Sequence, residues 1–166
     1  MSVDRIQLLS ESLCNLVRAQ EVVSNPAAAV KELLDNAIDA GATSIQLDIL
    51  GSGKSAVHVI DNGCGMSPID ARMAFERHAT SKIHTKEDLE NIQTLGFRGE
   101  GLASIATVSR VELRTRREED EIGTEVTIAG GEFVKQTPVA APLGTSIKMS
   151  DIYYNVPGRR RSLKRD

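Results

Sequence analysis

The segment from Asn25 to Gly41 constrains the fold most, because it carries the start, the period and the stop of one long helix. Asn25 can cap that helix, Pro26 suits its first turn, and Gly41 can end it in a left-handed conformation. Between these ends, apolar residues recur at intervals of three and four: Val30, Leu33, Leu34, Ala37 and Ile38. This period predicts a helix that packs through one apolar face.

Alternating apolar and polar residues after this helix predict strands. Residues 45–50 alternate, GSGK turns the chain, and 55–60 alternate again, as in a β-hairpin. Further strands are expected at 108–115, 123–129, 132–137 and 144–149, and further helices near Ser67, at 86–92 and after Gly99. We therefore expect an α+β fold, a two-layer sandwich whose mixed, mostly antiparallel sheet is covered on one face by helices.

Size and composition suit one globular domain, since the 166 residues are 40% apolar and 26% charged. No apolar run approaches the roughly 20 residues of a membrane-spanning helix, and the start lacks the pattern of a secretory signal. A cytosolic or nuclear protein without a membrane partner is expected. The two cysteines and three histidines show no ligand spacing, which argues against a zinc site or a disulfide framework.

The basic residues gather at the end of the chain, although the formal net charge is −3. Five of the seven positions from 159 to 165 are basic: Arg159, Arg160, Arg161, Lys164 and Arg165. They could hold a nucleic-acid backbone electrostatically, or they could form the solvated start of a helix, and both interpretations stay open. Aromatic residues make up only 3%, which disfavours a stacking platform for single strands.

Two glycine-rich strings do not fit familiar phosphate-binding loops. GSGKS at 51–55 would need a glycine where Asp48 stands and a helix where the chain alternates as a strand, so a hairpin turn is expected there. GFRGEG at 96–101 does not have the spacing of a dinucleotide-binding turn.

Four other elements can carry nucleotide chemistry. Glu32 and Asn36 lie four apart on one helix face, where a carboxylate can take a proton from water and an amide oxygen can ligate magnesium. Asp61, at a strand end before Gly63 and Gly65, could accept a hydrogen bond from an adenine amino group, although DNG also makes an ordinary Asx turn. The third element is Thr80–Lys82.

The fourth is the glycine-rich turn that leads into the helix after Gly99. Its free backbone N–H groups could cradle phosphates, although glycines also serve simple loop closure.

In this order, the four elements resemble those of the GHKL ATPases, and within that superfamily the chain resembles the MutL DNA mismatch-repair family. The segments that carry the likeness span nearly the whole chain: NPAAAVKELLDNAIDAGATSI, IDNGCGM, RHATSKI, TLGFRGEGLASIATVSRVEL and GTSIKMSDIYYNVPGRR. The resemblance implies the GHKL (Bergerat) ATP-binding fold. Residues 1–166 would form one such domain, the N-terminal part of a longer protein.

The resemblance also assigns residues. Glu32 matches the general base, Asn36 the magnesium ligand, and Asp61 with Gly65 the adenine-binding motif. The remaining matches are nucleotide contacts: Thr80, Ser81, Lys82, Gly96, Arg98, Gly99, Glu100, Gly101, Leu102 and Thr145.

The function implied is a slow Mg²⁺-dependent ATPase that acts as an ATP-gated clamp between mismatch recognition and strand excision. Its expected partners are ATP and ADP, DNA held through its backbone, a MutS-type protein, and a second copy or a paralogue. Residues 1–24 would take part in dimerisation, and 78–101 would form an ATP lid. The protein would be cytoplasmic in a bacterium and nuclear in a eukaryote. A module that binds nucleotide without hydrolysis is the alternative, and a histidine-kinase domain is disfavoured.

Two segments depart from the family pattern. LVRAQEVV stands where the family usually has QIAAGEVV, so that Arg18 and Gln20 replace small residues and are expected to hinder N-terminal packing and dimerisation. Gly101 replaces the usual alanine, which should make ordering of the lid costlier by about 0.5–1 kcal/mol.

Overall fold

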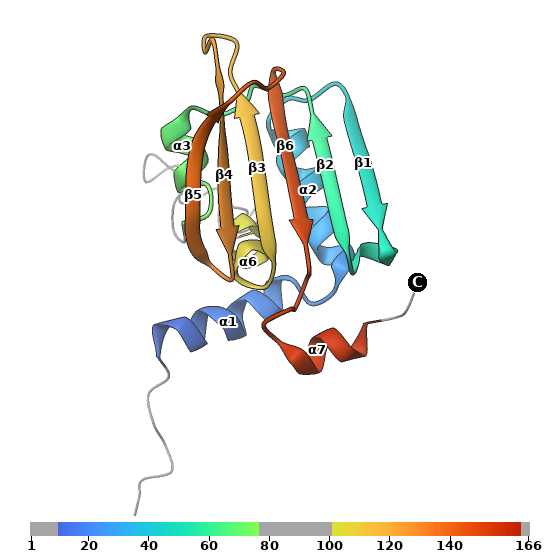
Figure 1. Cartoon of the computed structure of the whole chain (residues 1–166). Helices are drawn as coiled ribbons and strands as arrows, with labels where there is room; N and C mark the ends of the chain where they lie inside the picture. Colours follow the sequence, from blue (N-terminus) through green and yellow to red (C-terminus); the bar gives the residue numbers. More distant parts are fainter. Residues whose placement is uncertain (1–9, 77–100, 164–166) are drawn as a thin grey trace, which may run out of the picture.

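A single six-stranded antiparallel sheet organises the protein. The computed structural model describes residues 10–76 and 101–163 (Figure 1). The strand order is β1-β2-β6-β3-β4-β5, and every pairing is antiparallel. The strands are β1 (Ile45–Leu50), β2 (Ala56–Asp61), β3 (Arg110–Arg116), β4 (Gly123–Ala129), β5 (Glu132–Val139) and β6 (Gly144–Ser150). The last strand, β6, therefore pairs with β2 of the β1–β2 hairpin on one side and with β3 of the consecutive strands β3, β4 and β5 on the other.

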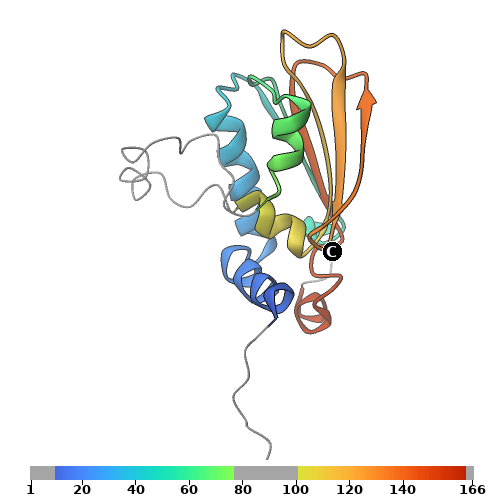
Figure 2. The same ribbon diagram turned by 90° about the vertical axis from the view of Figure 1, so that its left-hand side faces the viewer.

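Helices cover one face of this sheet. The helices of the described residues are α1 (Glu11–Val22), α2 (Pro26–Asp39), α3 (Pro68–Met73), α6 (Gly101–Thr107) and α7 (Pro157–Ser162). Figure 2 shows α2, α3 and α6 on the same side of the sheet, with α1 and α7 beyond one end. The expected two-layer α+β architecture is confirmed. The helix expected at 86–92 lies outside the described residues.

Helix α2 begins and ends where its sequence signals predict. The Asn25 side chain accepts a hydrogen bond from the Ala28 N–H at 2.8 Å, and Pro26 is the first helical residue. The buried stripe is narrower than expected, because Ile38 is 62% exposed. The fully buried residues of α2 are Ala29, Leu33 and Ala37, which recur every four positions. Ile38 lies one residue further around the helix axis than Ala37, so its side chain does not face the sheet.

Helix α1 was not among the expected helices. Ser10 caps it by accepting a hydrogen bond from the Leu13 N–H at 3.2 Å. Its apolar pattern is weak because Leu13 and Val17 are both 44% exposed. The helix is held through Ala19 at its C-terminal end, which is fully buried, and by packing on α6.

The hairpin reading of GSGK is confirmed. β1 and β2 pair in register from Ile45 opposite Asp61 to Leu50 opposite Ala56. The short 3₁₀ turn η1 (Gly51–Gly53) joins them, and the Lys54 N–H donates to the Gly51 carbonyl at 2.8 Å. The lysine therefore closes a turn and does not open a helix.

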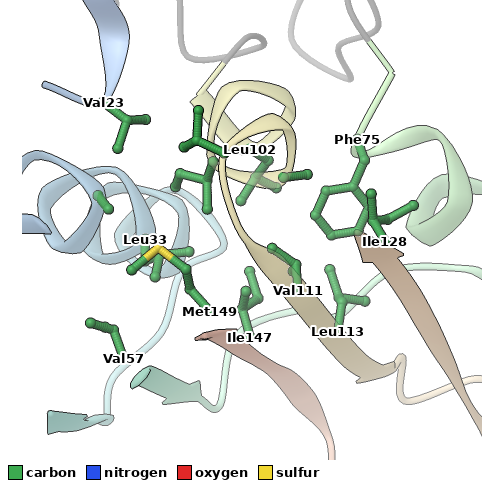
Figure 3. Close-up of a cluster of buried hydrophobic side chains, with 14 of the residues drawn as sticks. Val23, Leu33, Val57, Phe75, Leu102, Val111, Leu113, Ile128, Ile147 and Met149 are labelled. Carbon is green, nitrogen blue, oxygen red and sulfur yellow. The ribbon is translucent and has the colours of Figure 1, made fainter. Parts of the chain in front are cut away.

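The core fills the space between the helices and the covered face of the sheet (Figure 3). Helix residues such as Leu33 and Leu102 meet strand residues such as Val57, Val111 and Met149 there. Since side chains alternate along a strand, this packing also decides which polar residues face the helices. Within residues 10–76 and 101–163, no helix is long and apolar enough to cross a membrane.

Candidate functional site

Asp61 ends β2 with its side chain on the covered face. It is 8% exposed, and its Oδ1 accepts a hydrogen bond from the Gly63 N–H at 2.8 Å. Burial raises the pKa of Asp61, whereas backbone hydrogen bonds from Gly63 and Thr145 lower it less strongly. The Asx-turn reading is thus correct. A carboxylate has about four acceptor sites, so a buried one held by the Gly63 and Thr145 N–H groups would still gain from a further hydrogen-bond donor.

The loop after Asp61 is tied to the C-terminal end of α2. The Asn62 Oδ1 accepts from the backbone N–H groups of Thr43 at 2.8 Å and Ser44 at 2.9 Å. The Cys64 N–H donates to the Ala40 carbonyl at 3.0 Å. Asp61 is therefore held beside the last turn of the helix that carries Asn36.

Gly65 allows this loop to lie against the end of β3. Its φ is +72°, and a Cβ there would overlap the carbonyl group of Arg116. The next residue, Met66, donates its N–H to the Thr115 Oγ1 at 2.9 Å. A glycine is required here by the protein's own backbone.

Glu32 and Asn36 are both half-buried on α2. The Asn36 Nδ2 donates to the Glu32 carbonyl at 3.1 Å, which leaves the amide oxygen, Oδ1, pointing away from that bond and able to accept or to ligate. The Glu32 carboxylate lies where a Cβ on Gly101 would stand, with Cδ at 3.0 Å from that position. Gly101 therefore makes room for the Glu32 side chain at the start of α6.

Thr145 lies directly beside Asp61 in the sheet. The two residues pair across β2 and β6, and Thr145 is 7% exposed. On its other side it pairs with Thr115 of β3, and the two hydroxyl oxygens are 2.9 Å apart. Thr115 was not predicted. Its position in the alternation of β3 marks it as inward-facing, but nothing local indicates that the covered face is polar at this row.

The other expected contacts divide into two groups. Leu102 is 6% exposed and packs in the core, so only its backbone is left to meet a ligand (Figure 3). The rest lie outside the described residues: Thr80, Ser81, Lys82, Gly96, Arg98, Gly99 and Glu100. The expected lid, 78–101, shares this gap except for its last residue.

The basic end of the chain is partly engaged within the fold. Arg159 donates to the Ser24 carbonyl at 2.6 Å and to the Gln20 Oε1 at 3.1 Å. Arg160 donates from Nη1 to two backbone carbonyls, at 2.9 and 3.0 Å. Arg159, Arg160 and Arg161 lie within helix α7, in line with the expected helix, and Arg161 is exposed, whereas Lys164 and Arg165 lie outside the described residues. Gln20 thus contacts an arginine of α7, and its expected effect on dimerisation stays a prediction.

An open groove of about 530 Å³ lies elsewhere, between α3 and the edge formed by β4 and β5. Ile69 and Met73 line one side, and Gln136 and Pro138 line the other. No expected site residue lines it, so the groove is separate from the Asp61 cluster.

Comparison with known proteins agrees with this fold. Residues 23–152 match the family of histidine kinase-, DNA gyrase B- and HSP90-like ATPases. The DNA mismatch repair protein MutL of Porphyromonas gingivalis W83 is 55% identical over 161 residues, which cover 97% of this chain and 26% of that protein. MutL of Christiangramia forsetii is 52% identical over 98% of this chain and 26% of its own length. The chain thus spans about a quarter of these relatives.

Solved structures give the same result. The Aquifex aeolicus MutL ATPase domain complexed with ADP aligns with a TM-score of 0.66 and 29% identity, covering 87% of this chain and 49% of that one. The N-terminal domain of a DNA repair protein aligns with a TM-score of 0.73 and 27% identity, covering 89% and 41%. The chain therefore belongs to the histidine kinase-, DNA gyrase B- and HSP90-like ATPase family, and within that family its resemblance is to the ATPase domain of MutL mismatch-repair proteins.

Proposed function

We propose that this chain binds ATP with Mg²⁺ and hydrolyses it slowly, as the ATPase domain of a MutL-type mismatch-repair protein. The observation that carries the proposal is that the Asp61 loop is tied to α2, the helix that also carries Glu32 and Asn36. The contact between Cys64 and Ala40 joins the Asp61 loop to α2, and the Gly101 contact joins α2 to α6. The ADP in the Aquifex aeolicus MutL structure supports a nucleotide as the ligand.

Asp61 is the proposed contact for the adenine base. Its carboxylate is buried beside Thr145, and its two oxygens have more acceptor sites than the Gly63 and Thr145 N–H groups use. An adenine amino group is a neutral donor of the size that such a site needs, and a hydrogen bond to a charged acceptor contributes about 1.5–3 kcal/mol. Gly63 lets the loop approach Ala40 after α2, and Gly65 lets it approach Arg116 at the end of β3.

Asn36 is the proposed magnesium ligand. Its Nδ2 is engaged with the Glu32 carbonyl, which leaves a neutral hard oxygen, Oδ1, for the cation. Among residues 10–76 and 101–163, no group of three or more His, Cys, Asp and Glu side chains could hold a metal by itself. A magnesium ion at Asn36 would thus depend on phosphate and water oxygens, which fits the preference of Mg²⁺ for nucleotide sites. When bound, the ion would supply charge neutralisation at the phosphates.

Glu32 is the proposed general base. It is half-buried one helical turn before Asn36, and a carboxylate in this position can accept a proton from a water that attacks a phosphate. Gly101 leaves the space that the carboxylate occupies. The contact with Gly101 also supports the alternative function, a module that binds nucleotide with little or no hydrolysis. In that case Glu32 would pack against α6 and would not act on a water.

The wider role follows from the family and is part of the proposal. Residues 78–101 would form a lid over the nucleotide, and residues 1–24 would take part in ATP-dependent pairing with a second copy or a paralogue. Such a clamp would link a MutS-type mismatch-recognition protein to strand excision on DNA. Since two arginines of the basic end bind backbone carbonyls, Arg161 is the described residue of that cluster that remains exposed for a DNA phosphate.

Replacing Glu32 by alanine tests the proposal. Hydrolysis of ATP should be lost, whereas ADP affinity should stay within a few-fold of the original, because the base does not hold the nucleotide. Glu112→Ala, which removes an exposed carboxylate from β3, is the matched control and should change neither quantity. Phosphate release and isothermal calorimetry measure the two effects. Unchanged ATP turnover in Glu32→Ala would show that Glu32 is not the general base. ADP binding without any turnover in the original chain would favour the alternative, a module that binds nucleotide without hydrolysis.

A further inference from the structure

Gly101 and Gly65 differ in what a side chain would meet at each position. A Cβ on Gly65 would overlap the backbone carbonyl of Arg116, and the φ of Gly65 is positive. A Cβ on Gly101, the first residue of α6, would meet the side chain of Glu32: it would overlap Oε2 and lie 3.0 Å from Cδ and 3.5 Å from Cγ. The space beside Gly101 is thus filled by the end of a flexible side chain.

The backbone of α6 gives no reason for a glycine at this position. Gly101 is helical, and it is not among the glycines with positive φ. Glycine is less favourable than alanine in a helix, because it loses more backbone freedom on folding. Gly101 therefore weakens α6, and the Glu32 carboxylate uses the space that the missing methyl group leaves.

The core fixes the two helices on either side of this contact. Leu33, next to Glu32, and Leu102, next to Gly101, are buried in the same core (Figure 3). The helices cannot move apart to admit a methyl group without opening this core, since protein interiors are close-packed. Glu32 is half-buried, and its side chain has several rotatable bonds. A Cβ on residue 101 would therefore displace the carboxylate and leave both helices in place.

The contact matters for the proposed base because it occupies an oxygen of the carboxylate. A general base must lie about 2.6–3.2 Å from the atom whose proton it takes. The Glu32 Oε2 instead lies where a methyl group on Gly101 would stand, so no water fits between this oxygen and α6. The contact depends on the packing of α2 on α6. It therefore competes, in every turnover, with the position from which the carboxylate acts on a water.

We propose that Gly101 is a positioning residue that holds Glu32 in a resting position, the contact of its carboxylate with α6, and that Glu32 must leave this position to act as the base. This inference rests on the proposed role of Glu32 in hydrolysis. The release is a rotation of one side chain. Residue 101 therefore sets the fraction of molecules in which the base is available, and it limits the rate of hydrolysis without limiting nucleotide affinity.

Gly101→Ala adds the methyl group that fills the resting position. The minor state of a two-state equilibrium is commonly populated at about 0.1–10%, so removal of the resting position should raise kcat for ATP about tenfold or more. ADP affinity should stay within a few-fold, because the substitution leaves the backbone of α6 and the Asp61 loop unchanged. Phosphate release and isothermal calorimetry on the full chain measure the two quantities.

Gly158→Ala is the matched control. Gly158 lies in the first turn of α7, and a Cβ there would have nothing within 4 Å. The control therefore makes the same change at the start of a helix without displacing another side chain. It should alter neither kcat nor ADP affinity.

Thermal unfolding tests the contact without hydrolysis. In the original chain, Gly101→Ala favours the helix but expels the Glu32 carboxylate, whereas in a Glu32→Ala background it favours the helix and fills the space left empty. The rise in melting temperature from Gly101→Ala should therefore be larger in that background. The effect of Gly158→Ala should be the same in both, because sites without shared partners are additive. The same curves show that each variant is folded.

An unchanged or lowered kcat in Gly101→Ala overturns the inference, and so do equal melting shifts in the two backgrounds. The double variant of Glu32 and Gly101 should hydrolyse ATP as slowly as Glu32→Ala, and faster turnover would show that the released group is not Glu32. If the original chain and Gly101→Ala both bind ATP and neither hydrolyses it, release of Glu32 does not start the reaction and the inference is wrong.

Glu32→Ala separates these results from failure of the proposed function. If Glu32→Ala abolishes hydrolysis while Gly101→Ala leaves kcat unchanged, only the role of Gly101 is wrong. If Glu32→Ala hydrolyses ATP normally, Glu32 is not the base, and its proposed role fails together with the inference.

Discussion

Replacing Asp61 by asparagine should separate nucleotide affinity from stability, because burial makes the charge useful for one and costly for the other. Asparagine keeps the size of the side chain and an oxygen that can accept the Gly63 N–H now bound at 2.8 Å. It removes the negative charge that the proposed adenine contact uses. A hydrogen bond to a charged acceptor contributes about 1.5–3 kcal/mol, so ADP should bind about 10- to 150-fold more weakly.

The expected effect on stability has the opposite sign. Burial raises the pKa of Asp61 in the folded state, so the ionised carboxylate lowers the free energy of unfolding at neutral pH. That penalty disappears as the pH falls through the raised folded-state pKa toward the unfolded value, since the folded state then takes up its proton first. Asparagine is neutral throughout. Without nucleotide, the variant should therefore melt at or above the original temperature at neutral pH, with a difference that shrinks on acidification.

Calorimetry with ADP and thermal unfolding over a series of pH values test both halves. Asp48→Asn is the control, because Asp48 is an exposed carboxylate on β1, and it should alter neither ADP affinity nor melting appreciably. ADP affinity of the original chain should also decrease as the pH falls through the Asp61 pKa. Retention of full ADP affinity in Asp61→Asn, or a melting temperature well below that of the control, would refute the reasoning.

Two predictions concern stability alone. The Tyr153 hydroxyl donates to the buried Val23 carbonyl at 2.6 Å, so Tyr153→Phe should cost about 1–2 kcal/mol and lower the melting temperature by about 2–8 °C; an unchanged midpoint would contradict this. Gly65→Ala should cost more than Gly41→Ala in the same thermal assay, since both have positive φ but only Gly65 would overlap the Arg116 backbone. Equal losses would show that the backbone conformation alone decides the cost.

Local sequence signals were sufficient to predict most of the helices and strands. Asn25, Pro26 and the four-residue period predict α2 because capping and amphipathicity act within a few neighbouring residues. Alternation predicted β1 and β4 with their observed bounds. The signal was insufficient for α1, where Leu13 and Val17 are half exposed and the anchoring comes from Ala19 and the packing on α6.

The candidate site also contains residues that the sequence predicts and contacts that it does not. Glu32, Asn36 and Asp61 could be proposed from the sequence, because each stands in a short segment whose spacing or position suits its chemistry. The order of the strands could not be read from such segments, since the pairing of β6 between β2 and β3 joins residues far apart in the chain. That pairing alone places Thr145 between Asp61 on β2 and Thr115 on β3.

The sequence by itself thus determined the amphipathic helix, the strands, and the residue types able to meet a nucleotide and a magnesium ion. Only the tertiary structure decided which of these groups come together. It buried Asp61, brought Gly101 against Glu32, and gave Gln20 a contact with Arg159. The physical reason is range: capping and periodicity depend on adjacent turns, whereas burial and hydrogen bonding in a sheet depend on partners that only the folded chain brings within reach.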